Sequence, residues 1–282
     1  MTIDTPPDDR RPDPPDGSDW TSFLQWCLPQ LRMRWGGFRK VRRQVCRRIR
    51  RRMEELNLPD IEAYRRRLST HPDEWRVLDD LCRVSISRLY RDRRLFEFLS
   101  AEGLPALAAA AEGAPLRCWS AGCASGEEPY TLRILWDLEV GPRFGSVPLQ
   151  IVATDADEHL LERAREASFQ ISSLKEVPDR WRQEAFVREG HRYRVRDSFR
   201  GGIEFLRQDL RQELPAGRFH LILCRNLVFT YYDQDLQRQI LIDILSKLHP
   251  KGLLVLGSHE SPPAKTAALV RLPAAPWVYV KA

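Results

Sequence analysis

Five short apolar runs follow one another after about residue 116, and most of them are bounded by small or polar residues. The runs are LRCWSAG, LQIVATD, IEFLRQD, FHLILCRN and GLLVLGS. Several are separated by stretches with helical periodicity, namely EEPYTLRILWDLEV, DEHLLERAREASF and QDLQRQILIDILSKL. Strands that alternate with helices indicate a parallel sheet with helices on both faces. We therefore expect a ligand site beyond the carboxyl ends of these strands.

The N-terminal third has no strand pattern, and its periodic stretches are helical. We expect residues 1–19, which are acidic and proline-rich, to form a disordered leader. Residues 20–100 are then a helical domain, and residues 101–282 are the α/β domain. No apolar run approaches the roughly 20 residues that span a bilayer, and the first residues lack the pattern of a signal peptide.

Arginine dominates the helix that we expect at residues 39–56. From Arg32 to Arg52 there are eleven Lys or Arg residues and no acid. Val41, Val45, Ile49, Met53 and Leu56 recur at helical spacing as an apolar stripe. The other faces carry Arg42, Arg43, Arg47, Arg48, Arg50, Arg51 and Arg52. Because like charges repel, this helix predicts an acidic partner, for which nucleic acid, an anionic membrane or an acidic protein helix is suitable.

The six cysteines are scattered at positions 27, 46, 82, 118, 123 and 224, with no C-x-x-C pair. This spacing disfavours a structural zinc site or a disulfide framework. We expect buried free thiols, no bound metal and a reducing, cytoplasmic location.

Polar groups after the first three strands suggest a nucleoside with a cationic tail. The turn SAGCASGEE ends in Glu127 and Glu128, which would repel a phosphate and attract a cation. Asp155 ends the second strand, where an acid accepts hydrogen bonds from ribose hydroxyls. Asp209 follows the third strand, beside the expected adenine amine. The nucleoside that matches is S-adenosylmethionine, although acids at a helix N-terminus are also favoured by the helix dipole, by about 0.3–1 kcal/mol.

The motifs WSAGCASGEEPYTL, ATDADEHLLERA, FHLILCRNLVFTYYD and LHPKGLLVLGSHES resemble, in this order, those of CheR-type chemoreceptor glutamate methyltransferases. The resemblance covers roughly residues 23–282. It implies a helical N-terminal domain, then a Rossmann-like class I methyltransferase domain with a small antiparallel β insert at about residues 190–202. It also implies transfer of a methyl group from S-adenosylmethionine to protein glutamates, giving methyl esters, with the acidic substrate held on the arginine-rich helix.

The resemblance assigns a role to individual residues. Those that would contact the cofactor are Ser85, Ser87, Arg91, Glu127, Asp155, Asp209, Leu210, Arg225 and Asn226. Arg91 and Tyr231 would also act in catalysis, Arg91 on the acceptor carboxylate and Tyr231 near the sulfonium. A glutamate acceptor, whose pKa is near 4.3, is already ionised at pH 7 and needs no general base.

Several departures from the family pattern suggest a divergent branch. Ser85 and Ser87 stand where the family usually has Asn and Thr, and Leu89 and Tyr90 replace two phenylalanines. Thr230 is one residue more than usual between Asn226 and the tyrosine, which makes Tyr232 a rival of Tyr231. The insert also lacks the glycine-containing loop that recognises a receptor tail.

Two alternatives to a protein carboxyl methyltransferase therefore remain. The first is a methyltransferase that acts on a small molecule or another protein side chain. The second is a module without turnover that senses the cofactor or binds nucleic acid through the arginine-rich helix.

Overall fold

The computed structural model describes residues 17–282 except 112, 146 and 265, and it divides into two compact units. One unit ends at Arg83 and the other begins at Val84. Most of the expected leader lies outside the described residues. Its last three residues, 17–19, are the first turn of a helix. No helix in the described part of the chain is both long and apolar enough to cross a membrane.

The first unit is entirely helical in its described part. Its helices are α1 (Gly17–Gln30), α2 (Trp35–Phe38), α3 (Arg42–Glu55), α4 (Ile61–Thr70) and α5 (Glu74–Cys82). The apolar stripe predicted for the arginine-rich helix is confirmed, because α3 buries Val45, Ile49 and Met53. Asp60 caps α4 by accepting a hydrogen bond from the backbone N–H of Ala63 at 2.7 Å.

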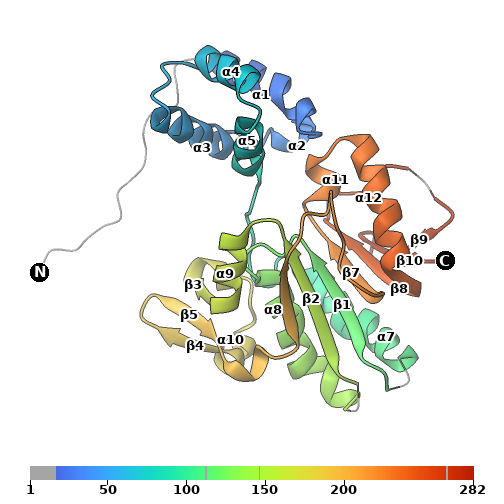
Figure 1. The fold of residues 1–282 in the computed structure, drawn as a ribbon. Helices are drawn as coiled ribbons and strands as arrows, with labels where there is room; N and C mark the ends of the chain where they lie inside the picture. The colour runs from blue at the N-terminus through green and yellow to red at the C-terminus, as the bar shows by residue number, and fades with distance from the viewer. Residues whose placement is uncertain (1–16, 112, 146, 265) are drawn as a thin grey trace, which may run out of the picture. The chain divides into compact units, whose positions relative to one another are not determined.

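A seven-stranded sheet forms the centre of the second unit, with the order β6-β2-β1-β7-β8-β10-β9 (Figure 1). The strands in chain order are β1 (Leu116–Ala121), β2 (Leu149–Asp155), β6 (Ile203–Arg207), β7 (Phe219–Cys224), β8 (Leu248–Leu256), β9 (Leu269–Arg271) and β10 (Val278–Lys281). The five predicted strands pair in parallel, as expected. Two further strands that were not predicted extend the sheet, and β10 runs antiparallel to both β8 and β9.

Helices and their continuations complete the second unit. They are α6 (Arg93–Phe98), α7 (Leu104–Ala110), α8 (Glu127–Leu135), α9 (Glu158–Glu166), α10 (Asp179–Ala185), α11 (Val228–Tyr231) and α12 (Gln234–Lys247). Single π-helical turns, Leu99–Gly103 and Trp136–Val140, extend α6 and α8. The π-helical turn Leu99–Gly103 joins α6 to α7 without a break.

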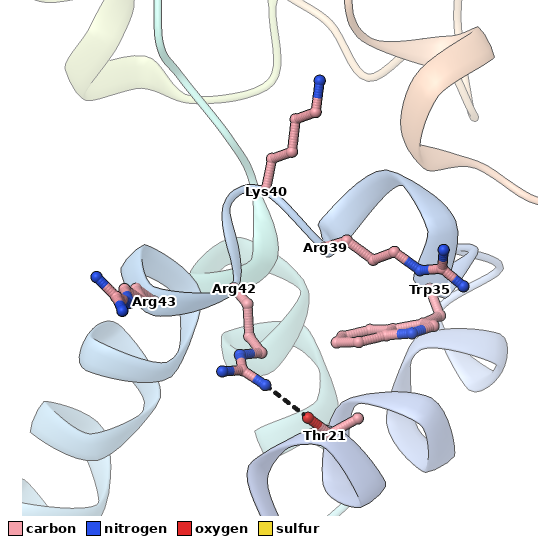
Figure 2. Close-up of a pocket in the computed structure, with 6 residues that line it drawn as sticks. All are labelled: Thr21, Trp35, Arg39, Lys40, Arg42 and Arg43. Atoms are coloured by element: carbon pink, nitrogen blue, oxygen red, sulfur yellow. Dashed lines mark hydrogen bonds between the residues drawn. The ribbon is translucent and has the colours of Figure 1, made fainter. Parts of the chain in front are cut away.

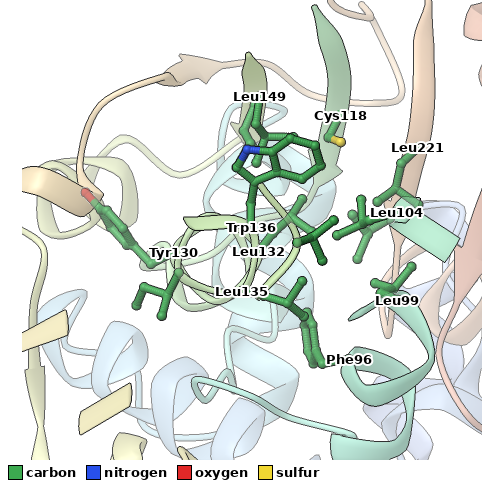
Figure 3. Close-up of a cluster of buried hydrophobic side chains, with 14 of the residues drawn as sticks. Phe96, Leu99, Leu104, Cys118, Tyr130, Leu132, Leu135, Trp136, Leu149 and Leu221 are labelled. Atoms are coloured by element: carbon green, nitrogen blue, oxygen red, sulfur yellow. The ribbon is translucent and has the colours of Figure 1, made fainter. Parts of the chain in front are cut away.

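Side chains of α6, α7 and α8 pack on one face of the sheet (Figure 3). Phe96, Leu99 and Leu104 lie there against Cys118 of β1 and Leu221 of β7. This packing explains why the second unit begins at Val84, well before the limit expected at residue 101. The segment after Val84 contributes to the core of the sheet domain, although its sequence is helical.

The small antiparallel insert is a separate three-stranded sheet with the order β3-β5-β4. Its strands are β3 (Ser168–Gln170), β4 (Phe186–Glu189) and β5 (Arg192–Val195). The insert is wider than the residues 190–202 that we expected, because β3 lies far upstream in the chain and pairs with β5 across a helical excursion. The run GHRYRVRDSFRGG contains β5 alone.

Candidate functional site

The loop after β1 approaches its neighbours so closely that glycine is required at two positions. Gly122 has φ +78°, and a Cβ there would lie 2.5 Å from Cδ2 of Leu227. Gly126 has φ +88°, and its Cβ would lie 3.0 Å from the Cβ of Ala164. Left-handed backbone with so little space suits only glycine. The loop is therefore packed closely against Leu227, which follows β7, and against Ala164 of α9.

Asp155 ends β2 and is fixed by two backbone groups. Its Oδ2 accepts a hydrogen bond from the N–H of Ala124 at 2.9 Å, and its Oδ1 accepts one from the N–H of Asp157 at 3.0 Å. A carboxylate oxygen has room for more than one donor. The acid is thus held at the predicted edge of the sheet, where it is tied to the loop after β1.

The neighbouring acids Glu127 and Glu128 have different surroundings. Glu127 is 5% exposed, and burial raises the pKa of its carboxyl group, although Ser87 hydrogen-bonds to it. Its Oε2 is buried and has no hydrogen-bond partner among the described residues. A buried, unpartnered carboxylate oxygen is costly unless a donor is supplied. Oε2 therefore fits the ammonium group of a methionine tail.

Glu128 is engaged inside the protein. Its Oε1 accepts a hydrogen bond from Oγ of Ser120 at 2.6 Å, and its Oε2 accepts one from Nη1 of Arg225 at 2.8 Å. Only the first of the two acids is therefore available to a ligand. Local sequence alone gave both acids the same expectation, and only the family resemblance assigned the cofactor contact to Glu127.

Arg225 follows β7 at the predicted place, but its guanidinium is bound by protein groups. It pairs with Glu128 and Asp92, and its Nη2 also donates to the carbonyl oxygen of Arg91 at 3.0 Å. The side chain is 5% exposed. This guanidinium is therefore directed at the segment that carries Arg91. Any contact of Arg225 with a cofactor would come from its backbone.

Asp209 follows β6, where a group near adenine was predicted. Two nitrogens of the Arg211 guanidinium donate hydrogen bonds to Asp209: Nη2 to Oδ2 at 2.6 Å and Nε to Oδ1 at 3.0 Å. Leu210 between them is 7% exposed. The sequence RQDLR places Arg211 two residues after Asp209, but the prediction did not consider that the two would pair. Asp209 therefore reaches the site as part of an ion pair.

Arg91 lies between two residues with left-handed backbone, Tyr90 (φ +59°) and Asp92 (φ +64°). Such a conformation is unfavourable for a tyrosine and persists only when surrounding contacts impose it. The N–H of Tyr90 donates to Oγ1 of Thr131 at 2.9 Å, and Nη1 of Arg91 donates to the carbonyl oxygen of Ile86 at 2.9 Å. The segment from Ser85 to Asp92 is therefore held against α8 and β7.

The two candidate tyrosines have different environments. Burial raises the pKa of Tyr231, and the positive charge of Arg91 acts in the opposite direction. Tyr232 is 8% exposed, and the guanidinium of Arg211 lies 5.6 Å from its ring centroid. The positive charge of Arg91 therefore acts on the hydroxyl of Tyr231, whereas the ring of Tyr232 lies beside the guanidinium of Arg211.

Glu260, in the run LGSHES after β8, is an acid that sequence reasoning missed. It is 8% exposed and accepts hydrogen bonds from the backbone of Asn226 and Gly257 and from Thr230. The signal was an acid directly after a buried strand, at the same edge of the sheet as Asp155. Asn226 itself has left-handed backbone, with φ +54°.

The first unit holds a basic pocket of about 350 Å³ at the start of α3. It is lined by Thr21, Trp35, Arg39, Lys40, Arg42 and Arg43. Figure 2 shows the Arg42 side chain beside the Trp35 indole, with Nη1 of Arg42 donating to Oγ1 of Thr21 at 2.8 Å. All four charged lining residues are cationic, so the pocket favours an anionic group.

The arginines of α3 fall into two classes. Arg43, Arg47 and Arg51 are exposed and lie one turn apart along one face. Arg52 and Arg48 are less exposed: Arg52 pairs with the buried Glu74, and Arg48 donates to the carbonyl oxygens of Leu81 and Arg83. Part of the charged face therefore stabilises the helical unit, and docking of an acidic partner on this helix stays a prediction.

The strand order, the glycine loop and the acid that ends the second strand together define a class I methyltransferase domain that binds S-adenosylmethionine. Comparison with known families agrees: residues 85–275 match the family described as CheR methyltransferase, SAM binding domain, and residues 40–81 match the CheR methyltransferase all-alpha domain. The chain belongs to the CheR methyltransferase family.

Individual relatives are similar over most of this chain. A chemotaxis protein methyltransferase of Listeria innocua is 33% identical over 180 residues, which are 64% of this chain and 66% of the relative, slightly less than two thirds of its length. Chemotaxis protein methyltransferase 1 of Pseudomonas aeruginosa is 30% identical over 77% of this chain and 81% of the relative. The solved N-methyltransferase NodS of Bradyrhizobium japonicum has a TM-score of 0.35 and 16% identity, over 68% of this chain and 97% of that one, a level that supports no further argument.

Proposed function

We propose that the protein transfers the methyl group of S-adenosylmethionine to glutamate side chains of an acidic protein helix, forming methyl esters. The observation that carries this proposal is the set of charged groups after the strands: Asp155 ends β2, Oε2 of Glu127 is buried without a hydrogen-bond partner among the described residues, and the charge of Arg91 acts on Tyr231. In this proposal the two acids serve the cofactor, and Arg91 and Tyr231 serve the acceptor carboxylate.

Four groups of this chain would hold the cofactor. Asp155 would bind the ribose hydroxyls, Glu127 the ammonium group, and Leu210 would pack on the adenine, with Asp209 at its amine. When bound, S-adenosylmethionine supplies a methyl group made electrophilic by the sulfonium. The residues of the chain bind and orient the reactants and exclude water from them.

The acceptor glutamate must be oriented, but it does not need a base to activate it. A glutamate carboxylate is ionised at neutral pH, so one of its oxygens forms the bond to the methyl carbon as the carbon–sulfur bond breaks, and no proton moves. Arg91 would hold the carboxylate through its guanidinium, which matches a carboxylate with paired donors. Because burial raises the pKa of Tyr231, its hydroxyl stays protonated and can donate a hydrogen bond.

The exposed arginines of α3 and the basic pocket at its start would dock the substrate. Arg43, Arg47 and Arg51 repeat at the spacing of a helix, which suits acids repeated on one face of a partner helix. The curated relatives are named chemotaxis protein methyltransferases, and we propose a chemoreceptor as the partner of this chain. The six buried free thiols support a reducing, cytoplasmic compartment.

The decisive experiment is incubation of the purified protein with methyl-labelled S-adenosylmethionine and a lysate, followed by mass spectrometry of the labelled proteins. Label on glutamate that mild base releases as methanol supports the proposal. Stable label on nitrogen, label confined to small molecules, or binding of cofactor without turnover would each replace it with another function.

A further inference from the structure

The carboxylate of Glu260 joins the two loops that follow β7 and β8. Its Oε2 accepts hydrogen bonds from the N–H of Asn226 at 2.8 Å and from the N–H of Gly257 at 2.7 Å. Its Oε1 accepts one from Oγ1 of Thr230 at 2.5 Å. Hydrogen bonds to an ionised group are stronger than those between neutral groups. A single side chain thus holds three points of the site, two of them on the loop after β7.

The surrounding backbone is shaped to admit this carboxylate. A Cβ on Gly257 would lie 2.7 Å from Oε2 of Glu260 and 2.8 Å from Oδ1 of Asn226, so glycine is needed there. Asn226 has left-handed backbone, which asparagine tolerates better than most residues. The loop is therefore over-determined by contacts, as strained functional loops are.

Thr230 directly precedes Tyr231 in the short helix α11. The N–H of Tyr231 donates to the carbonyl oxygen of Leu227 at 2.9 Å, so the turn that carries the tyrosine is closed on the same loop. One end of this loop is tied to Glu260 through Asn226, and the other through Thr230. The residue that lengthens the loop relative to the family pattern is therefore itself a point of attachment.

We propose that Glu260 is a positioning residue for methyl transfer, which acts through Thr230 and Asn226 to set the place of Tyr231. The inference rests on the proposed function and adds to it a residue that would not touch either reactant. A glutamine at this position has one oxygen instead of two. It can accept either the two backbone N–H groups or the threonine hydroxyl, and its NH₂ group then points at the donors that are left.

Kinetics of three variants test the proposal. Glu260→Gln should lower kcat by about 10²-fold, the loss that a misplacement near 1 Å can cause, while the affinity for S-adenosylhomocysteine and the KM of the cofactor stay unchanged. Thr230→Val, which removes the hydroxyl at nearly constant volume, should also lower kcat, and Thr230→Ser should restore it. Glu213→Gln, at an exposed acid, is the matched control and should leave kcat unchanged.

Hydrogen exchange gives a readout independent of activity. The amides of Asn226 and Gly257 should exchange faster in Glu260→Gln than in the wild-type protein, with the rest of the sheet unaffected. Unchanged kcat in Glu260→Gln or Thr230→Val, with wild-type activity measured in parallel, would overturn the positioning role and leave the proposed function intact. Equal losses of kcat and of affinity for S-adenosylhomocysteine would also overturn it, because they indicate a structural role. An inactive wild-type protein would reject the proposed function instead, and the exchange data would then decide whether Glu260 fixes the loop.

Discussion

Arg225 and Asp92 form an ion pair that ties the end of β7 to a residue with left-handed backbone. Asp92 directly follows Arg91, and the same guanidinium also donates to the carbonyl oxygen of Arg91. Arg225, which lies 134 positions further along the chain, thus holds both the carbonyl group of Arg91 and the side chain of the next residue, and so orients the Arg91 side chain. The arginine of the C-R-N motif therefore holds the segment that carries Arg91, the residue proposed to bind the acceptor carboxylate.

Asp92→Asn isolates this effect. Asparagine tolerates the left-handed backbone, so the variant should fold while the charge–charge contact with Arg225 is lost. We expect a loss of about 1.5–3 kcal/mol in the free energy of unfolding, the range for hydrogen bonds to charged groups, and a lower kcat. Chemical denaturation and steady-state kinetics measure the two quantities. Wild-type kcat in a destabilised variant would show that the pair serves stability alone.

Asp155→Asn should weaken binding of S-adenosylmethionine by about 1.5–3 kcal/mol. Asparagine keeps one oxygen for a backbone N–H, which makes it a cleaner probe than alanine in a residue that also holds Ala124. Calorimetry measures the affinity. ATP and NAD should not bind the wild-type protein, because Glu127 and Asp155 repel phosphates, and equal affinity for ATP would contradict the assignment of the site.

Cofactor affinity should fall as the pH is lowered through the raised pKa of Glu127. The ammonium group favours the ionised carboxylate, so the pKa in the complex is lower than in the free protein. The affinity is therefore highest above the free-protein pKa and decreases below it. Because burial raises this pKa, the decrease should begin at higher pH than for an ordinary glutamate, whose pKa is about 4.3. Titration calorimetry across pH, with Glu127→Gln as the variant that lacks this dependence, checks the sign.

Tyr231→Phe should lower kcat while Tyr232→Phe has little effect. The reason is that Tyr231 lies within reach of the charge of Arg91, whereas the ring of Tyr232 lies beside Arg211. Arg91→Ala should also lower kcat, and Arg91→Lys should not restore it fully, because an ammonium cannot form the paired contacts of a guanidinium. Affinity for S-adenosylhomocysteine serves as the control. The reverse order of the two tyrosine variants would shift the active-site assignment to Tyr232.

Charge reversal at Arg43, Arg47 and Arg51 should raise the KM of an acidic protein substrate and leave cofactor affinity unchanged. High salt should imitate it, since surface attraction is screened over about 8 Å at physiological ionic strength. Arg52→Glu is the contrasting variant: it places a carboxylate against the buried Glu74 and should lower the melting temperature. A triple variant with an unchanged KM would remove α3 from the docking surface.

Local periodicity and strand ends made the second unit largely predictable. The predicted runs LQIVATD and FHLILCRN contained the strands β2 and β7, because buried parallel strands are continuous apolar segments. The short strands β9 and β10 were not predicted, because three or four residues are too few to show a periodic pattern. The extent of the insert escaped for another reason: its strand β3 pairs with residues that lie some twenty positions away.

The site was predictable by position but not by partner. Asp155 and Glu127 lie where the strand pattern placed them, yet nothing local revealed that Glu128 would bind Arg225 across 97 positions. The same limit applies to Glu260, two of whose three donors lie 30 and 34 residues upstream. Ion pairs of this kind depend on which loops meet in three dimensions, and a single sequence does not contain that information.

Because every cysteine is buried, the reaction of each thiol with a reagent reports on local unfolding around it. All six thiols are free and buried, and burial raises the pKa of each, which makes them unreactive while the fold is closed. Cys123 lies within the first loop of the site and Cys224 directly precedes Arg225, whereas Cys27, Cys46 and Cys82 belong to the helical unit. The rate at which a thiol reagent modifies each of them would therefore time the opening of each region separately, in the native chain and without an added probe.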